Sequence, residues 1–480
     1  MRETVRLDVG RIRAEVGRQG LTLVRDHLFP IIVEEAVSQL KTPNDMLATA
    51  GRVRDHMRVA GVTNARVIQH EGCYPAVFGE IKADLPNAPT ILVGGHFDGQ
   101  PSAKNQWTVT QPHEPKFVTQ GGETRVFGRG TSDDWGQVLT HVMAVKMIRD
   151  LGLPLPVNIK FLIEGGEETG SPNMDKFVKV HLDLLKCDLV ILTDSAPGRP
   201  GIPVITTMAR GLVGADVKLE FGTNDPHSGD SLTYSAVDVL SRILALKNLK
   251  TMRVGIPGFY DRVRPMTDPA IARLIEMPFD VDHFIRMNGL TGIVTLDNCS
   301  AQAAMWAQPT YQVHTILDPQ GEAIPHTNKL TTRAQAYVTM RLVADQDPKE
   351  IFELFSREVY RRLVEETNLG PETLTIKAGH VAYPFSTDVT GPTFDAIALS
   401  MSEAFGVHQV DFAGCGGTEP IAMYYQTILG VPVVFNAYND PSDHYHGNDE
   451  SFSIDRGFKP GIIANVLVYQ RLYDLGNTQQ

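Results

Sequence analysis

The sequence has few cysteines, and none is placed for a disulfide framework or a thiolate metal site. Its 480 residues include four cysteines, and no two of them form a CxxC pair. A small disulfide-stapled fold and a cysteine-based zinc site are therefore excluded. Widely spaced cysteines are typical of proteins from a reducing compartment, so we expect a cytoplasmic protein.

Long apolar runs and an excess of basic charge are also missing. No run of about 18 apolar residues occurs, so we expect no membrane-spanning helix. The amino-terminal stretch MRETVRLDVGRIRAEVGRQG lacks the apolar core of a signal peptide, so we expect no export. The 44 basic residues are outnumbered by 56 acidic ones, which gives a net charge of −12 and disfavours nucleic acid and anionic membranes as partners.

What the sequence does contain is an α/β pattern. Short apolar runs at 91–95, 157–163 and 189–193 alternate with helix-length segments such as 138–148. Strands that alternate with amphipathic helices predict a mainly parallel sheet with helices on both faces.

The middle of the chain has a different pattern. Segments 213–221 and 334–342 alternate strictly between apolar and other residues, as half-exposed strands that face one layer of helices do. Two helical segments, near 235–247 and 348–366, accompany them. The pattern predicts an antiparallel α+β domain in this region.

These two patterns define the expected domains. The α/β pattern resumes near residue 384, with a buried strand at 432–438. We therefore expect a discontinuous catalytic domain formed by residues 1–209 and 383–480, and an inserted domain over residues 210–382.

Histidine and acidic residues cluster where the predicted strands end. A histidine or a carboxylate follows each of three strands: His96 and Asp98, then Glu167 and Glu168, then Asp194. Ligands of open α/β sheets bind outside the carboxyl ends of the strands, so we expect these side chains to converge in one crevice. Imidazole and carboxylate without thiolate suit zinc, and also manganese or cobalt.

Three further residues belong to the same pattern. Asp133 opens a helix after the turn GRGTS, and His444 and His446 follow the strand at 432–438. Each feature alone is weak, because a pair such as Glu167-Glu168 is more often a solvated surface pair. Their shared position at strand ends and helix starts, where an unpaired buried charge is costly, favours a metal site. A G-x-S-x-G segment is absent, which argues against a serine hydrolase.

Together these segments resemble a known family, the two-zinc metallopeptidases that include carnosine dipeptidases, carboxypeptidase G, aminoacylase and succinyl-diaminopimelate desuccinylase. The matching segments run in the family's order over nearly the whole chain: GGHFDGQP (94–101), GRGTSDDWGQ (128–137), EGGEETGS (164–171), LTDS (192–195), DPHSGD (225–230), MRLVADQDP (340–348), CGGTEP (415–420) and HGNDES (446–451). The dipeptidase branch of the family is the most similar.

The resemblance implies a metal-binding role for five residues. Two divalent ions per chain, zinc or else manganese or cobalt, would be bound by His96, Asp133, Glu168, Asp194 and His446. Each histidine would bind one ion, Asp133 would bridge the two, and Glu168 and Asp194 would complete one site each. The family's spacing of four residues to Glu450 selects His446 over His444.

The resemblance also implies catalytic and substrate-binding residues. Glu167 matches the general base, and Asp98 would orient His96. His227 of the inserted domain matches a histidine that reaches into the neighbouring subunit's active site in dimeric members. Arg341 would bind the substrate's carboxylate, and the expected substrate-binding set also includes Asn328, His380 and Thr418.

The expected function is cleavage of the amide bond of dipeptides, or of similar small amides with a free carboxylate, by a cytoplasmic homodimer. The inserted domain would serve as a lid and dimerisation domain. An N-acyl-amino-acid hydrolase or another specialised amide hydrolase of the same family stays open as an alternative. A second alternative is a catalytically idle scaffold protein, which the presence of Glu167 with all five ligand matches disfavours.

Overall fold

The computed structural model describes residues 6–195, 198–230, 232–324, 328–387 and 389–478. The chain forms two compact units. The first comprises Met1–Thr207, Thr387–Ala413 and Pro420–Gln480, and the second comprises Met208–Ser386 and Gly414–Glu419. The inserted unit thus starts at residue 208 rather than 210, ends at 386 rather than 382, and includes a short later segment that was expected in the catalytic domain.

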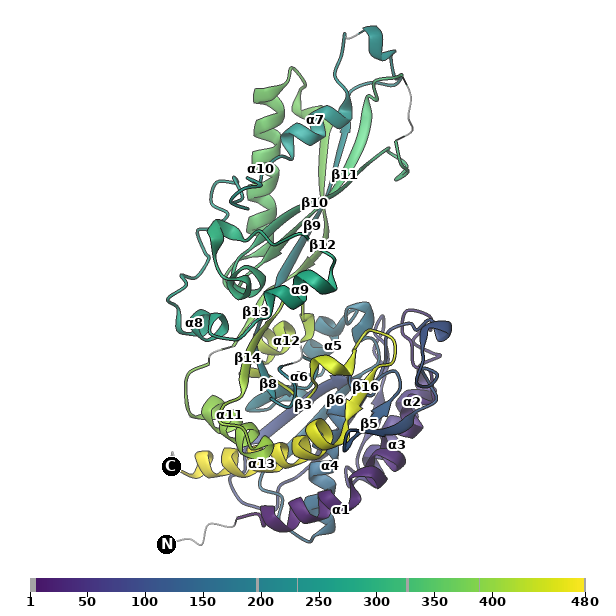
Figure 1. Cartoon of the computed structure of the whole chain (residues 1–480), viewed down its shortest axis with the longest axis vertical. Coiled ribbons are helices and arrows are strands. Elements are labelled where there is room, and N and C mark those ends of the chain that lie inside the picture. The colour runs from purple at the N-terminus through teal and green to yellow at the C-terminus, as the bar shows by residue number, and fades with distance from the viewer. Residues whose placement is uncertain (1–5, 196–197, 231, 325–327, 388, 479–480) are drawn as a thin grey trace. The chain divides into compact units, whose positions relative to one another are not determined.

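The first unit is built on a mainly parallel sheet (Figure 1). Its strand order is β1 (Arg66–Ile68), β2 (Ala76–Ile81), β6 (Asn158–Glu164), β3 (Thr90–His96), β7 (Leu189–Leu192), β15 (Val433–Ala437) and β8 (Val204–Ala209), with β14 (Asp411–Cys415) paired to β8. The four central strands β6, β3, β7 and β15 run parallel, whereas β1, β2 and β8 pair antiparallel. The predicted α/β fold class is confirmed.

Helices cover both faces of this sheet, as the two glycines before His96 illustrate. A Cβ atom at Gly94 would contact Tyr425 at 3.5 Å, whereas one at Gly95 would collide with Val138 of α4 (Trp135–Asp150). On the side of α4 lie α1 (Val9–His27), α11 (Pro392–Phe405) and α13 (Lys459–Thr478). The opposite face of the sheet, where Tyr425 lies, is covered by α5 (Met174–Val180), α6 (Leu182–Leu185) and α12 (Pro420–Tyr424).

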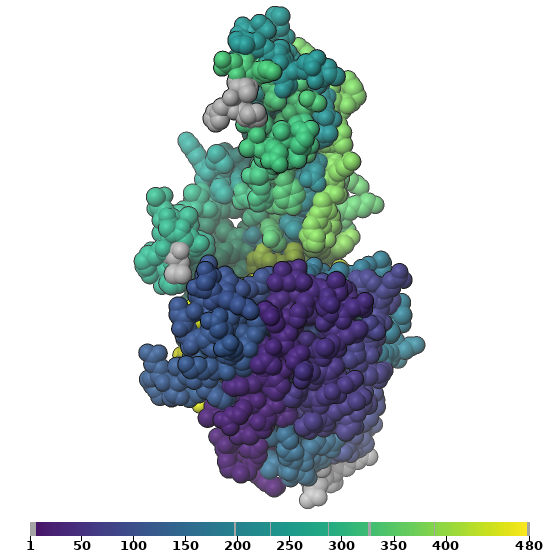
Figure 2. Space-filling model, turned by 90° about the vertical axis from the view of Figure 1, so that its right-hand side faces the viewer, coloured from purple at the N-terminus to yellow at the C-terminus, as the bar shows by residue number. Residues whose placement is uncertain are grey.

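The N-terminal segment packs at one edge of the unit. α2 (Phe29–Ile32) contacts α1 and α3 (Leu47–Val59), and α3 lies against β1 and β2. This segment, drawn in purple, forms much of the surface of the first unit that Figure 2 shows.

A smaller antiparallel sheet positions the loop that contains His446. Its order is β16 (Ser451–Ser453), β5 (Glu123–Phe127) and β4 (Lys116–Gln120). The pairing of β16 with β5 continues in a hydrogen bond of 2.9 Å from the backbone N–H of Gly128 to the carbonyl of Glu450. The loop before β16 is thereby held against the turn that contains Asp133.

The second unit contains a four-stranded antiparallel sheet. Its order is β10 (Thr310–Leu317), β11 (Arg333–Leu342), β9 (Gly211–Glu220) and β12 (Leu374–Ala382). Every second residue of β11 is buried, as the alternation in the sequence predicts. The buried face packs against α7 (Ala236–Ile243) and α10 (Pro348–Glu366), and the unit also contains α8 (Pro269–Ile275), α9 (Val281–Met287) and β13 (Phe385–Ser386).

The cysteines and the helices show two further features. All four cysteines are free, and two of them, Cys73 and Cys187, are buried. Among the helices in the described ranges, none combines the length and the apolar composition that crossing a bilayer requires.

Candidate metal centre

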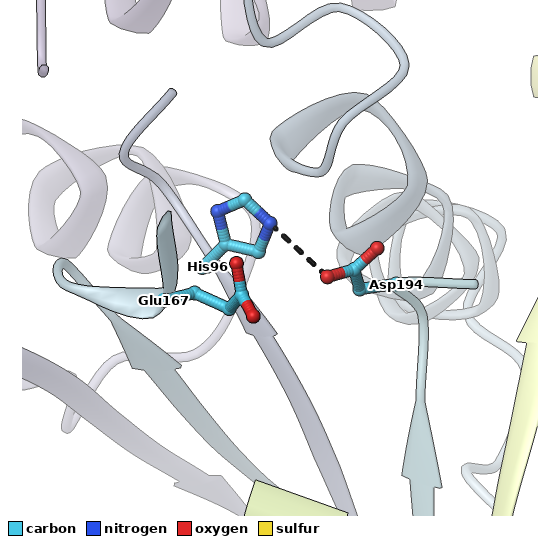
Figure 3. Close-up of side chains that lie close together, drawn as sticks. All are labelled: His96, Glu167 and Asp194. Atoms are coloured by element: carbon cyan, nitrogen blue, oxygen red, sulfur yellow. Dashed lines mark ion pairs between the residues drawn. The ribbon is translucent and has the colours of Figure 1, made fainter. Parts of the chain in front are cut away.

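Two groups of side chains that could each hold a metal ion lie near the carboxyl ends of the central strands. One group consists of His96, Glu167 and Asp194 (Figure 3), and the other of Asp133, Glu168 and His446. Within each group, one ligand atom per residue lies within 4.8 Å of the others. The structure therefore brings together the residues that follow β3, β6 and β7, and it places His446 rather than His444 with them.

Asp133 lies between the two groups. Its Oδ1 is 3.0 Å from Nε2 of His96, and its Oδ2 is 2.8 Å from Nε2 of His446. Nε2 of His96 is also 3.5 Å from Oδ2 of Asp194 (dashed in Figure 3), and Nε2 of His446 is 3.4 Å from Oε2 of Glu168. Each oxygen of Asp133 thus faces a different histidine, as a carboxylate that bridges two ions must.

Asp98 contacts both His96 and the glutamate pair. Its Oδ1 lies 3.3 Å from Nδ1 of His96, on the opposite side of the ring from the ligand group. The same carboxylate accepts hydrogen bonds of 3.2 Å from the backbone N–H groups of Glu167 and Glu168. The backbone carbonyl of Asp98 also lies 3.0 Å from Nδ1 of His96, so Asp98 contacts the imidazole through both groups, and its carboxylate holds the backbone of the two glutamates.

The charges in the cluster favour a cation. Burial alone would lower the pKa of His96, but its hydrogen bonds with three aspartates, Asp133 first, raise that pKa well above its usual value. Hydrogen bonds with Asp133 and Glu168 raise the pKa of His446 to about 10. Burial raises the pKa of Glu168, because its negative charge is costly there.

The residues also fit a divalent metal by their donor chemistry. Oε1 of Glu168 is buried and has no hydrogen-bond partner among the described residues. A buried carboxylate oxygen without a donor is costly, and a metal ion would satisfy it. Imidazole and carboxylate donors without thiolate are a ligand set that zinc accepts.

The comparison with known families decides the assignment. A family model described as peptidase family M20/M25/M40 matches residues 92–468, which is most of the chain and includes both ligand groups. The chain belongs to this peptidase family. It is a metallopeptidase, and the resemblance inferred from the sequence motifs is confirmed.

Individual M20 relatives agree with this assignment. The Beta-Ala-His dipeptidase of Mus musculus is 25% identical over 385 residues, which are 79% of this chain and 76% of the relative. The Cys-Gly metallodipeptidase DUG1 of Candida albicans is 25% identical over 386 residues, 79% of this chain and 78% of the relative. The solved structure of the dipeptidase Dug1p from Saccharomyces cerevisiae, at 21% identity, superimposes with a TM-score of 0.75 and covers 97% of this chain and 99% of that one, so the fold is shared.

The remaining residues that were predicted for this M20 peptidase's site belong to the second unit. The structure brings His227 and Asn328 together, because the backbone N–H of Ser228 donates a 2.7 Å hydrogen bond to the carbonyl of Asn328. Both side chains are exposed. Arg341 is partly exposed on β11, on the face opposite the helices, and its side chain has no ion-pair or hydrogen-bond partner within the described parts of the chain.

Two predicted substrate-binding residues differ in their placement. His380 is exposed, and it lies in the irregular part of β12 beside Gly214 of β9. Thr418 was expected in the catalytic domain, but its segment belongs to the second unit. The reason is that the backbone N–H of Arg210 is within hydrogen-bond distance of the carbonyls of Cys415 (3.2 Å) and Gly417 (2.9 Å).

The sequence did not predict a structural role for Glu450, which contacts the turn that contains Asp133. It accepts hydrogen bonds from the backbone N–H groups of Gly130 (3.1 Å), Ser132 (2.9 Å) and Asp133 (3.0 Å). It also forms a 2.7 Å ion pair with Arg129. Glu450 therefore holds the turn that carries Asp133, although the sequence offered it only as a spacing marker.

Asp134 was also left aside. Its Oδ2 accepts hydrogen bonds from the backbone N–H of His96 (3.2 Å) and from the hydroxyl of Thr193 (2.7 Å). Burial raises its pKa well above the usual value. The doubled aspartate of GRGTSDDWGQ was the available signal, and Asp134 joins the end of β3 to the residue after β7.

Proposed function

We propose that the chain is a two-metal dipeptidase that hydrolyses dipeptides, or small amides of the same shape, with a free carboxyl end. The observation that carries this proposal is the pair of ligand groups with Asp133 between them. The relatives named as Beta-Ala-His and Cys-Gly dipeptidases support a dipeptide as the substrate.

The proposed metal is zinc, with manganese or cobalt as alternatives. His96 and Asp194 would hold one ion, Glu168 and His446 the other, and Asp133 would contact both. When bound, the ions would polarise the scissile carbonyl and lower the pKa of the attacking water towards about 7.

Glu167 is the proposed general base. Its carboxylate lies in one group with His96 and Asp194 (Figure 3), and its backbone N–H donates a hydrogen bond to the carboxylate of Asp98. From this position Glu167 would take the proton of the attacking water and pass it to the leaving amine. Asp98 acts as a positioning residue, because it turns Nε2 of His96 towards the ligand group.

Arg341 is proposed to bind the carboxylate of the substrate. Its partial exposure and its lack of a protein partner in the described ranges leave the guanidinium available. A guanidinium binds a carboxylate through two parallel hydrogen bonds, which an ammonium group cannot reproduce. Asn328, His380 and Thr418 are proposed as further contacts of the substrate.

A hydrolysis panel tests this function. The metal-loaded enzyme should cleave dipeptides faster than their amidated forms and faster than N-acyl amino acids. Arg341→Lys should raise KM for dipeptides, while Arg333→Lys, on the same face of β11, should not. Equal rates on free and amidated dipeptides would remove the carboxylate contact, and preferred cleavage of N-acyl amino acids would assign the chain to that branch.

We also propose a homodimer in which His227 serves the partner's site, with the inserted unit as the lid and dimerisation domain. His227 is exposed, and β10 and β12 are the edge strands of the second unit's sheet, where unpaired backbone groups favour association. Mixing inactive His227→Ala and Glu167→Gln chains should then restore part of the activity, since one site of each mixed dimer has neither defect. Complete subunit exchange without any recovery would contradict this arrangement.

The proposed location is the cytoplasm, without nucleic-acid or membrane partners. The four free cysteines fit a reducing compartment, and the net charge of −12 disfavours polyanions. Fractionation that finds the protein in an oxidising compartment would contradict the proposal.

A further inference from the structure

The second unit contains a cavity of about 270 Å³ whose wall is mainly apolar. Its apolar side chains include Phe279, Phe284, Val294, Leu296 and Met305. Phe284 is 38% and Val294 is 58% exposed, so part of this apolar surface is open to solvent. All lining residues belong to the second unit, whereas both metal-ligand groups belong to the first.

Two cations, Arg210 and Lys247, also line the cavity, and no acidic side chain does so within the described parts of the chain. Arg210 is only 8% exposed, and its Nη2 donates to the carbonyls of Ala304 and Gln308. Its Nε is buried and has no hydrogen-bond partner among the described residues. A buried donor without an acceptor is costly, and the two carbonyls leave the charge of Arg210 without a counter-ion.

Lys247 has only neutral partners. Its Nζ donates to the carbonyl of Tyr311 (2.9 Å) and to Oε1 of Gln312 (2.8 Å). Burial lowers the pKa of Lys247, and burial together with the charge of Arg341 lowers the pKa of Arg210 to about 10. Neither cation has a counter-charge in the described ranges, so the cavity favours an anion.

We propose that this cavity binds a small carboxylic acid with an apolar body, whose carboxylate contacts Arg210 and Lys247. A cavity of about 150 Å³ accepts benzene, so the larger cavity here has room for roughly ten to twelve non-hydrogen atoms. 3-Phenylpropionate has this size and chemistry. Two kinds of molecule supply such an acid: the substrate or product of this enzyme, and an unrelated small acid. The substrate is a candidate because Thr310 of the cavity pairs with Arg341 of β11.

Calorimetric titration of the metal-loaded, full-length enzyme with 3-phenylpropionate tests the site. A ligand of this size is expected to bind with a dissociation constant on the order of 1 mM or below. The uncharged 3-phenylpropionamide should bind at least tenfold more weakly. Equal affinity for acid and amide, or the absence of binding, would overturn the proposal.

Two variants separate the cavity from the metal ions, which also attract carboxylates. Ala301→Phe places a large side chain in the cavity, and Arg210→Gln removes one of its two cations. Both should weaken binding at least tenfold, while Arg242→Gln, on the exposed surface of α7, should leave it unchanged. Unchanged affinity in a folded Ala301→Phe enzyme would place the acid elsewhere and refute the site.

Steady-state kinetics distinguishes the two sources of the acid. If the occupant is the apolar end of a dipeptide, 3-phenylpropionate competes with the substrate, and Ala301→Phe raises KM for dipeptides that end in phenylalanine. If the occupant is a separate acid, Ala301→Phe abolishes the binding of 3-phenylpropionate and leaves KM unchanged. Both results support a carboxylate site in the cavity.

Discussion

Replacement of Glu450 by glutamine should destabilise the first unit and weaken metal binding. Glu450 is fully buried, accepts hydrogen bonds from three backbone N–H groups of the turn 130–133, and pairs with Arg129. A glutamine of nearly the same size would turn an NH₂ group towards donors and would remove the counter-charge of Arg129. Asp133 lies in this turn, so its position should loosen as well.

The size of the effect follows from the burial of the ion pair. Arg129 is 4% and Glu450 is 0% exposed, and removal of one partner from a buried pair costs about 3–5 kcal/mol. Arg129 keeps hydrogen bonds to the hydroxyl of Ser102 (2.9 Å) and the carbonyl of Gly447 (3.0 Å), which places the loss near about 3 kcal/mol. At roughly 2 °C per kcal/mol in a domain of this size, the melting temperature should fall by about 6 °C.

The pH of the measurement matters for this prediction. Burial raises the pKa of Glu450, so its carboxyl group becomes neutral at a higher pH than an exposed glutamate does. The folded chain therefore binds this proton more tightly than the unfolded chain, and the wild type loses stability as the pH rises through the raised pKa. The glutamine variant lacks this group, so the difference in melting temperature should be largest at acidic pH and should shrink as the pH rises through the raised pKa.

Melting of the metal-free chains and elemental analysis after dialysis form the assay. Two melting transitions are distinguished by adding metal. A ligand stabilises the unit that binds it, so the transition whose melting temperature rises on metal addition is assigned to the first unit. Glu403→Gln is the matched control, since it removes the same charge from an exposed pair with Arg471 and should cost about 1 kcal/mol or less. A Glu450→Gln chain that melts within about 2 °C of the wild type and keeps both ions would refute the reasoning.

Three more predictions concern single residues of the first unit. Glu167→Gln should keep the metals but lower kcat by about 10²-fold or more, because the amide cannot accept the proton; normal turnover would exclude Glu167 as the base. Asp133→Ala should lose metal together with activity, since its two oxygens face different histidines, and two ions retained per chain would contradict bridging. Burial, then the charge of His56, lowers the pKa of His27 to about 4, so the unfolded chain binds more protons between pH 6.5 and 4. Stability should fall by up to about 3 kcal/mol as the pH drops through this window. His27→Phe should flatten that fall in an acid denaturation series, and an unchanged slope would contradict the assignment.

The architecture could be predicted because it depends on local periodicity. The alternation over 334–342 follows from the two faces of a strand, and the structure buries every second residue of β11. The helix expected at 348–366 is α10, which begins at Pro348 where the side chain of Asp347 accepts hydrogen bonds from the first turn. The placement of His96 and Glu167 could be inferred as well, because the carboxyl ends of parallel strands meet at one edge of a sheet.

Only the tertiary structure revealed the supports of the site and the cavity. Glu450 contacts a turn that lies more than 300 residues earlier, and Arg210 reaches the carbonyl of Gln308 across 98 residues. The segment of Thr418 joins the second unit through backbone hydrogen bonds to Arg210. Periodicity reports which face of an element is buried, because that depends on neighbours along the chain. The partner of a buried charge depends on which distant elements pack against it, and no local pattern contains that information.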